Sequence, residues 1–329
     1  MRLFFLGSGA FGLPTLRHLA AHAGHTLCGV LTQPDRPAGR GKTLSATPIG
    51  EWAATNLPGV PLIKAENVNE PGLLARVRAE FGPGGTAAVE AWIVIAFGQK
   101  LSPALLEGVR AVNLHASLLP RWRGAAPINA AMLAGDAQTG NSVITLAQRM
   151  DAGLILGQST RMIEPQHTAG ELHDLLAGDG PALMESVLSD MAAGTGAGSA
   201  GVVQDEALAT KAPKLSRADA WVDFTQDAQV CRQRIHGLTP WPGIAAKVGS
   251  HDVKLLRVAS DEHGVGASMP GAAGAIVDAQ GGTIRCGGGS SLRMLEVQPA
   301  GGRAMPWSAF VAGRRVAAGE VVSAGRPVC

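Results

Sequence analysis

Short apolar runs that alternate with segments of helical periodicity constrain the first half of the chain more than any other feature. Residues 13–22, which follow the first run, place Leu13, Leu16 and Leu19 on one helical face. Continuous apolar strands joined through helices are typical of a parallel sheet that helices cover on both faces. We therefore expect an α/β domain built on strands at residues 3–7, 26–32, 92–97, 111–116 and 142–147.

The pattern changes after Trp241, where short β-type runs are separated by Gly, Asp and Ser. Such runs predict a small β-barrel or sandwich. They lie at residues 246–260, 274–279, 282–287 and 291–298.

The boundary between these two regions is predicted from glycine and proline. Residues 171–194 have helical character, and we expect Gly178, Gly180 and Pro181 to break that helix in two. The Gly-rich segment 194–201 then begins a linker. We expect a first domain over 1–193, a linker over 194–212 and a second domain over 213–329.

Composition places the chain among ordinary globular proteins, because 46% of its 329 residues are hydrophobic and 16% are charged. Residues 1–207 carry a net charge of −3 and residues 208–329 one of +5. So small a basic excess fits a polyanionic partner or an ordinary solvated surface equally well. No apolar run approaches the length of a membrane span, and the first run is too short for a signal segment.

The four cysteines lie far apart in the sequence and form no C-x-x-C pair. This spacing argues against a disulfide framework or a cysteine metal cluster, and we expect a cytoplasmic protein without metal. The four are Cys28, Cys231, Cys286 and Cys329.

Residues 7–12 read G-x-G-x-x-G between the first strand and the first helix, the pattern of a dinucleotide-binding turn. The acidic residue expected at the end of the second strand is missing, since Asp35 lies inside a loop rich in proline and arginine. Glycines also serve tight turns and close helix packing. We favour that structural interpretation over nicotinamide or flavin binding.

Asn113 and His115 stand at the carboxyl end of an expected strand, where open α/β sheets form their ligand crevices. Strand alternation directs both side chains to one face, where an amide N–H and an imidazolium could donate to the same oxygen. A carbonyl that becomes a tetrahedral oxyanion needs such donors. Asp151, before a further apolar strand, is the candidate acid that would orient His115. The alternatives are a structural histidine and an Asx turn.

Residues 32–44 form a basic loop that carries Arg36, Arg40 and Lys42 among two prolines and two glycines. Long basic loops commonly contact phosphates. A solvated loop is the alternative, although Pro34 and Pro37 limit its freedom.

Taken together, several stretches resemble one family, the methionyl-tRNA formyltransferases. The basic loop and the run SLLPRWRGAAPI are specific to this branch, whereas the Asn/His/Asp set marks the wider group of folate-dependent formyltransferases. The likeness extends over nearly the whole chain. It is carried by TQPDRPAGRGKTL (32–44), VIAFG (94–98), VNLHASLLPRWRGAAPI (112–128), GDAQTGNSV (135–143), MDAG (150–153), KLSRADAWVDF (214–224), TPWPG (239–243) and LEVQPAGGRAM (295–305).

The resemblance implies a Rossmann-like catalytic domain followed by a small OB-like domain that binds tRNA. The implied reaction moves a formyl group from 10-formyltetrahydrofolate to the α-amine of methionyl initiator tRNA, with no metal, DNA or membrane involved. Asn113 and His115 would stabilise the oxyanion, and Asp151 would orient or charge His115 and relay a proton. The implied folate contacts are Phe97, Gly98, Ser117, Leu118, Leu119 and Pro120, and the implied tRNA contacts are Arg36, Arg40, Lys42 and Arg303.

Two stretches depart from the family pattern. Arg149 and Met150 precede the acid where the family has Gly-Leu, which affects the shape of the folate pocket. Near the end of the chain the usual lysine after the glycine is missing, and Gly302 and Arg303 stand in its place. Two other functions stay open: formyl transfer to a small amine such as glycinamide ribotide or an amino sugar, and noncatalytic tRNA binding.

Overall fold

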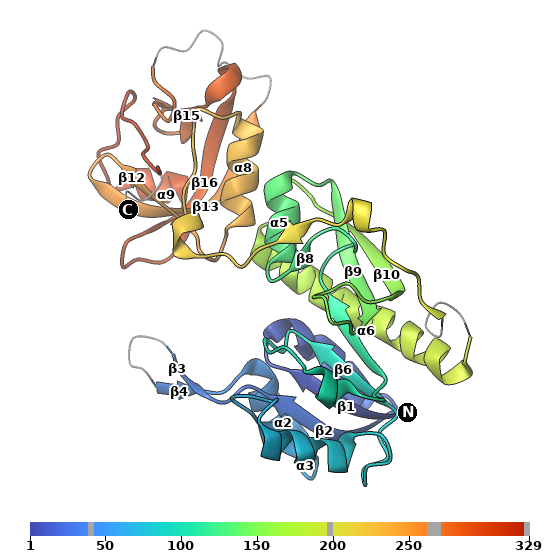
Figure 1. Ribbon diagram of the computed structural model, residues 1–329. Coiled ribbons are helices and arrows are strands. Elements are labelled where there is room, and N and C mark those ends of the chain that lie inside the picture. The colour runs from blue at the N-terminus through green and yellow to red at the C-terminus, as the bar shows by residue number, and fades with distance from the viewer. Residues whose placement is uncertain (39–42, 196–199, 262–270, 326–329) are drawn as a thin grey trace. The chain divides into compact units, whose positions relative to one another are not determined.

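The computed structural model describes residues 1–38, 43–195, 200–261 and 271–325. The chain divides into two compact units (Figure 1). Unit 1 comprises Met1–Arg123, Gly140–Arg161 and His173–Lys211, and unit 2 comprises Gly124–Thr139, Met162–Leu172 and Ala212–Cys329.

Unit 1 is built on a seven-stranded sheet of described residues with the order β10-β9-β7-β6-β1-β2-β5. Neighbouring strands from β7 to β5 pair in parallel, whereas β9 runs antiparallel to β7. The expected mostly parallel, Rossmann-like sheet is therefore confirmed. Its strands are β1 (Arg2–Gly7), β2 (Thr26–Thr32), β5 (Leu62–Lys64), β6 (Ala91–Ile95), β7 (Ala111–His115), β9 (Gln138–Thr145) and β10 (Ile155–Met162).

Helices and short strands complete the first part of the chain. A hairpin of β3 (Arg36–Ala38) and β4 (Thr43–Ser45) carries the basic loop, and β8 (Arg123–Gly124) pairs with β11 (Lys211–Ala212). Helix α2 packs on β2 and β5, the last two strands at one end of the sheet (Figure 1). The helices are α1 (Leu13–Ala21), α2 (Pro48–Asn56), α3 (Pro71–Phe81), α4 (Pro103–Leu106) and α6 (Ala169–Ala193).

The few aromatic side chains of unit 1 are concentrated in its core. Phe4 of β1 stacks on Phe81 of α3 with ring centroids 4.2 Å apart, and Trp92 of β6 packs edge-on against Phe4 at 5.1 Å. The Trp92 indole N–H donates to the carbonyl of Phe81, so burial leaves this polar group paired. The cluster thus packs α3 against β1 and β6, which pair in parallel.

The expected break in the helix over 171–194 is wrong, because α6 is continuous from Ala169 to Ala193 with Pro181 inside it. An internal proline costs a helix about 3 kcal/mol. Burial of Leu176, Met184 and Leu188, each 0% exposed, offsets this cost. Gly180 lets the helix approach the sheet, since a Cβ there would lie 2.8 Å from a Leu114 methyl.

Unit 2 contains an antiparallel sheet in the order β12-β13-β16-β15-β14, with β17 paired to β16. Residues after the sheet bridge its two edges, because Ser323 pairs with Lys247 of β12 and Val321 with Ala275 beside β14. This closure gives the small β domain that the sequence predicts. Its elements are α5 (Pro127–Ala134), α8 (Ala228–Gly237), β12 (Ile244–Val248), β13 (His251–Asp261), β14 (Ile276–Asp278), β15 (Thr283–Arg285), β16 (Ser291–Pro299), β17 (Met305–Pro306) and α9 (Trp307–Ala312).

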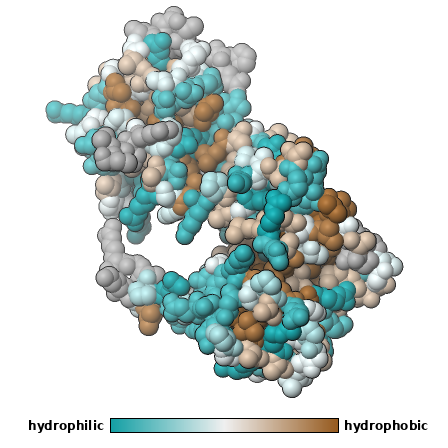
Figure 2. Space-filling model, in the orientation of Figure 1, coloured by the Kyte–Doolittle hydropathy of each residue, from teal (hydrophilic) through white to brown (hydrophobic). Residues whose placement is uncertain are grey.

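The face visible in Figure 2 is mainly hydrophilic, with hydrophobic residues in separate patches. Among the described residues, no helix combines the length and the apolar character that crossing a bilayer requires.

Candidate active site

Asn113 and His115 lie on the same face of β7 near its carboxyl end, between β6 and β9. His115 is buried and 7% exposed, whereas Asn113 is partly exposed. Within the described part of the chain, the side-chain amide of Asn113 has no hydrogen-bond partner. That amide can therefore donate to the oxygen of a bound ligand.

A backbone carbonyl fixes the orientation and tautomer of His115. The Nε2 atom of His115 lies 2.9 Å from the carbonyl oxygen of Trp122. A carbonyl oxygen can only accept, so Nε2 carries the proton in the neutral ring and Nδ1 keeps its lone pair. Nδ1 lies 3.7 Å from the Oδ2 atom of Asp151, which is 14% exposed. The lone pair of Nδ1 thus lies on the side of Asp151.

The backbone at this site adopts conformations that side chains other than glycine rarely take. Trp122 has φ of 63°, Asp151 has φ of 54°, and Ala96 at the end of β6 has φ of 46°. Each such residue costs about 1–3 kcal/mol and is typical of functional sites. Two of them supply the two contacts of His115, so the strain lies where the imidazole is held.

A hydrogen-bond network fixes the loop that carries Asp151. The Nε2 atom of Gln204 donates to the carbonyl oxygens of Asp151 and Gly153, at 2.8 Å each. The Oε1 atom of Gln204 accepts from Nε of Arg123 at 2.9 Å. Since Arg123 directly follows Trp122, the network joins the loop of Asp151 to the segment that orients His115.

Arg149, which departs from the family pattern, belongs to the same network. Both Arg123 and Arg149 pair with the carboxylate of Glu206, at 3.0 Å and 2.7 Å. Their hydrogen bonds lower the pKa of Glu206 to about 2, so it stays ionised. Sequence reasoning missed Gln204, Arg123 and Glu206, because no local pattern links residues 50 to 80 positions apart.

The four residues of the expected folate segment, 117–120, follow β7 in a turn that polar side chains hold in place. Ser142 accepts from the Leu119 N–H at 3.0 Å and donates to the Ser117 carbonyl at 2.6 Å. Ser117 is fully buried, and its hydroxyl donates to the carbonyl of Arg121. Leu119 is buried as well, so Leu118 and Pro120 are the members with side-chain surface available to a ligand.

Phe97 and Gly98 directly follow β6. The chain adds β2 and β5 on one side of β1 and then β6 on the other, so the strand order reverses between β1 and β6. The Phe97 carbonyl accepts from Ser8 Oγ at 3.1 Å and from Gln33 Nε2 at 2.8 Å. The Phe97 side chain is in the core, whereas Gly98 is exposed with φ of 78°. Such reversal points are where open α/β sheets bind ligands, and Gly98 offers its backbone there.

The turn over residues 7–12 is shaped by close packing. A Cβ at Gly7 would lie 2.9 Å from the Ile95 carbonyl oxygen, and one at Gly12 would lie 3.2 Å from the Ile95 side chain. These glycines therefore let the β1–α1 turn approach β6.

The residues expected to contact tRNA do not all fall within the described part of the chain. Arg36 begins the β3–β4 hairpin of unit 1, is exposed, and lies 3.9 Å from the Glu66 carboxylate. Arg303 is exposed in the turn after β16 of unit 2. Arg40 and Lys42, like Cys329, lie outside the described residues.

Comparisons with known proteins identify the family. Residues 1–188 match the formyl transferase family, and residues 214–315 match the formyl transferase C-terminal domain. The chain is 37% identical over 326 residues to the methionyl-tRNA formyltransferase of Moorella thermoacetica, covering 98% of this chain and 99% of the relative. It is 39% identical over 321 residues to that of Acidiphilium cryptum, covering 97% and 99%.

A solved structure shares the fold at low sequence identity. It is an N-formyltransferase from Helicobacter canadensis, in complex with folinic acid and dTDP-3-aminofucose, with a TM-score of 0.66 and 12% identity, covering 89% of this chain and 98% of that one. This structural match shows only the fold, whereas the matches to curated relatives over nearly the full length show the branch of the family. The chain belongs to the formyl transferase family and, within it, to the methionyl-tRNA formyltransferases.

Proposed function

We propose that this enzyme transfers the formyl group of 10-formyltetrahydrofolate to the α-amino group of methionyl initiator tRNA, giving N-formylmethionyl-tRNA and tetrahydrofolate. The observation that carries the proposal is the set of Asn113, His115 and Asp151 at the end of β7, with His115 Nδ1 3.7 Å from Asp151. The set supplies two donors for an oxygen and one proton acceptor, which a formyl transfer requires. We place the reaction in the cytoplasm, where both substrates occur.

In the mechanism we propose, the neutral α-amine attacks the formyl carbon, and a C–N bond forms as the carbonyl oxygen becomes an oxyanion. The Asn113 amide and a protonated His115 Nδ1 donate to that oxygen. Asp151 accepts the proton that the attacking nitrogen loses. The intermediate then collapses, the bond to N10 of the folate breaks, and N10 takes up the proton that Asp151 holds, so atoms and charges balance.

Transfer of this kind gains most from placing the amine beside the carbonyl, because a well-oriented pair removes about 7–11 kcal/mol from the barrier. The buried turn over 117–120 and the exposed backbone of Gly98 support a folate site beside Asn113. The structural relative from Helicobacter canadensis carries folinic acid, a reduced folate. We assign the pterin contacts to Gly98, Leu118 and Pro120, with Ser117, Leu119 and Phe97 holding the backbone.

For the acceptor we favour tRNA over a small amine. The β3–β4 hairpin carries Arg36 in the basic loop, and residues 208–329 carry a net charge of +5. Both features suit a polyanion, whose binding gains from counterion release. We further propose a catalytic domain at 1–193, a linker at 194–212 and a tRNA-binding domain at 213–329. The family matches over 1–188 and 214–315 support a division of the chain between them.

One competition assay tests this choice. Purified enzyme receives 10-formyltetrahydrofolate together with methionyl initiator tRNA, glycinamide ribotide and a dTDP-amino sugar. We expect formyl transfer to the aminoacyl-tRNA alone. Formylation of either small amine at the greater rate would assign the chain to that substrate instead, and no transfer with intact tRNA binding would leave a noncatalytic role.

A further inference from the structure

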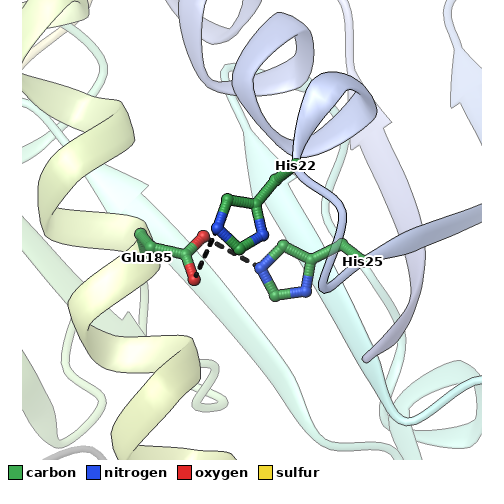
Figure 3. A group of neighbouring side chains, drawn as sticks. All are labelled: His22, His25 and Glu185. Atoms are coloured by element: carbon green, nitrogen blue, oxygen red, sulfur yellow. Dashed lines mark hydrogen bonds and ion pairs between the residues drawn. The ribbon is translucent and has the colours of Figure 1, made fainter.

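His22, His25 and Glu185 meet on unit 1 (Figure 3), and His18 also contacts Glu185. None of these residues belongs to the set at β7. His18 and His22 are four residues apart on and just after α1, so both lie on one helical face. His25 precedes β2, and Glu185 reaches the three rings from α6. The cluster thus joins the α1–β2 turn to a helix about 160 residues away in sequence.

The imidazole nitrogens surround a single carboxylate. Nε2 of His25 lies 2.9 Å from Oε2 of Glu185, Nε2 of His18 lies 3.3 Å from the same oxygen, and Nε2 of His22 lies 3.9 Å from Oε1. The ligand atoms of His22, His25 and Glu185 all lie within 4.8 Å of one another. The site is partly enclosed, because the His25 side chain is 6% exposed and that of Glu185 is 23% exposed.

The donor set and its spacing suit a metal ion. Imidazole nitrogen and carboxylate oxygen are the donors that Zn²⁺ and neighbouring divalent transition metals prefer. With bonds of about 2.0–2.1 Å, a tetrahedral zinc site has ligand atoms roughly 3.3 Å apart. The three nitrogen-to-oxygen distances to Glu185, from 2.9 Å to 3.9 Å, fall on either side of that value. We expect side-chain rotations to be sufficient to place the ligand atoms at tetrahedral positions around one ion.

We propose that His22, His25 and Glu185 bind one divalent transition metal of the zinc class, with His18 or a water in the remaining position. The Nε2 atoms of the histidines are the ligands. His25 Nδ1 already has a polar neighbour in the Met1 amine at 3.4 Å, which leaves Nε2 for the metal. The bound ion braces the α1–β2 turn against α6 and takes no part in formyl transfer.

Ordinary ion pairing explains the cluster less completely. Burial works against ionisation of Glu185, but the hydrogen bond and charge of His25, together with His22 and His18, lower the pKa of this carboxyl. His18 and His25 already share Oε2 of Glu185, and His22 stays 3.9 Å from Oε1, beyond hydrogen-bond distance. A cation at the centre satisfies all of them in their neutral form. The expectation of no metal rested on cysteine spacing and on the formyl-transfer reaction, and neither addresses these histidines.

The test is a titration of the full chain, freed of any affinity tag and stripped with a chelator, with Zn²⁺ followed by calorimetry. We expect one saturable site per chain with a Kd below about 10 μM, since two imidazoles and a carboxylate form catalytic-type zinc sites. Zn²⁺ at 100 times Kd should raise Tm by about 5 °C. Co²⁺ should give the visible absorption bands of a four- or five-coordinate site.

Two variants and one control locate the site. Glu185→Gln and His22→Gln should each weaken Zn²⁺ binding at least tenfold, and His22, which is 40% exposed, can be replaced with little effect on folding. His173→Gln removes a histidine whose Nδ1 lies 2.9 Å from Asp174, and should bind Zn²⁺ like the wild type. Absence of saturable binding by the wild type, or unchanged binding in both cluster variants, would overturn the proposal.

Discussion

His115 is held between two acceptors, with Nε2 2.9 Å from the Trp122 carbonyl and Nδ1 3.7 Å from the Asp151 carboxylate. The first contact fixes the tautomer, and the second leaves Nδ1 facing the carboxyl group. Because both contacts come from residues with positive φ, small changes in either loop should alter catalysis before they alter the fold.

Asn113→Ala removes one of the two proposed oxyanion donors without removing a hydrogen bond within the described protein. We expect kcat to fall by about 10²–10³, as is usual when one such donor is lost. The dissociation constant of the folate should stay within a few-fold of the wild-type value. Steady-state kinetics and fluorescence titration measure the two quantities. A kcat close to that of the wild type would remove Asn113 from the mechanism.

Gln204→Ala removes two hydrogen bonds to the loop of Asp151 and leaves the Arg123 guanidinium short of one acceptor. Each of these three hydrogen bonds contributes a net of about 1 kcal/mol, so the free energy of unfolding should fall by roughly 3 kcal/mol. Because the loop then no longer holds the Asp151 carboxylate in place, kcat should fall more than tenfold. KM for the tRNA should stay nearly constant.

Gln280→Ala, in an exposed turn of unit 2, provides the matched control for Gln204→Ala. It should leave kcat and the urea unfolding midpoint unchanged. If the two alanine variants lose the same activity, the network has no positioning role.

Arg36→Ala should weaken use of methionyl-tRNA more than use of the folate, because Arg36 begins the hairpin of the basic loop. We expect KM for the tRNA to rise several-fold. The slope of log KM against log salt concentration should also become shallower, by the amount that one phosphate contact contributes. Arg40→Ala should act in the same direction. Kinetics at several salt concentrations decide this, and an unchanged salt slope in both variants would exclude the loop from tRNA binding.

His236 should make the stability of unit 2 dependent on pH. Burial, with the charge of Arg232, lowers its pKa from 6.5 to about 4, and its Nε2 accepts from the Val258 N–H at 3.0 Å. The unfolded chain binds the proton first as the pH falls, so this stability is present above about pH 6.5 and is lost between pH 6.5 and 4. The loss amounts to about 3 kcal/mol at pH 4.

Urea unfolding from pH 7 to pH 4 measures that loss, with His236→Gln as the comparison. The variant should be less stable at pH 7 but should lose less stability on acidification. Parallel pH profiles in the two proteins would show that another group titrates.

The parts of the fold that follow from local pattern could be predicted from the sequence. The strand at 111–116 and the shared face of Asn113 and His115 follow from apolar character and alternation. The continuity of α6 could not, because it depends on tertiary burial of Leu176, Met184 and Leu188, which offsets the cost of Pro181. The same holds for Gln204, which reaches Asp151 across 53 residues, and for the contact of His25 with Glu185.

The central claim is that His115 and Asp151 act as one unit on the formyl carbon during transfer to methionyl-tRNA. Single-turnover rates for the wild type, His115→Ala, Asp151→Ala and the double variant test it most directly. Residues that act as a unit are strongly non-additive, so each single variant should lose about 10²–10⁴ in rate and the double variant little more. Losses that multiply in the double variant, or a single variant as fast as the wild type, would contradict the account.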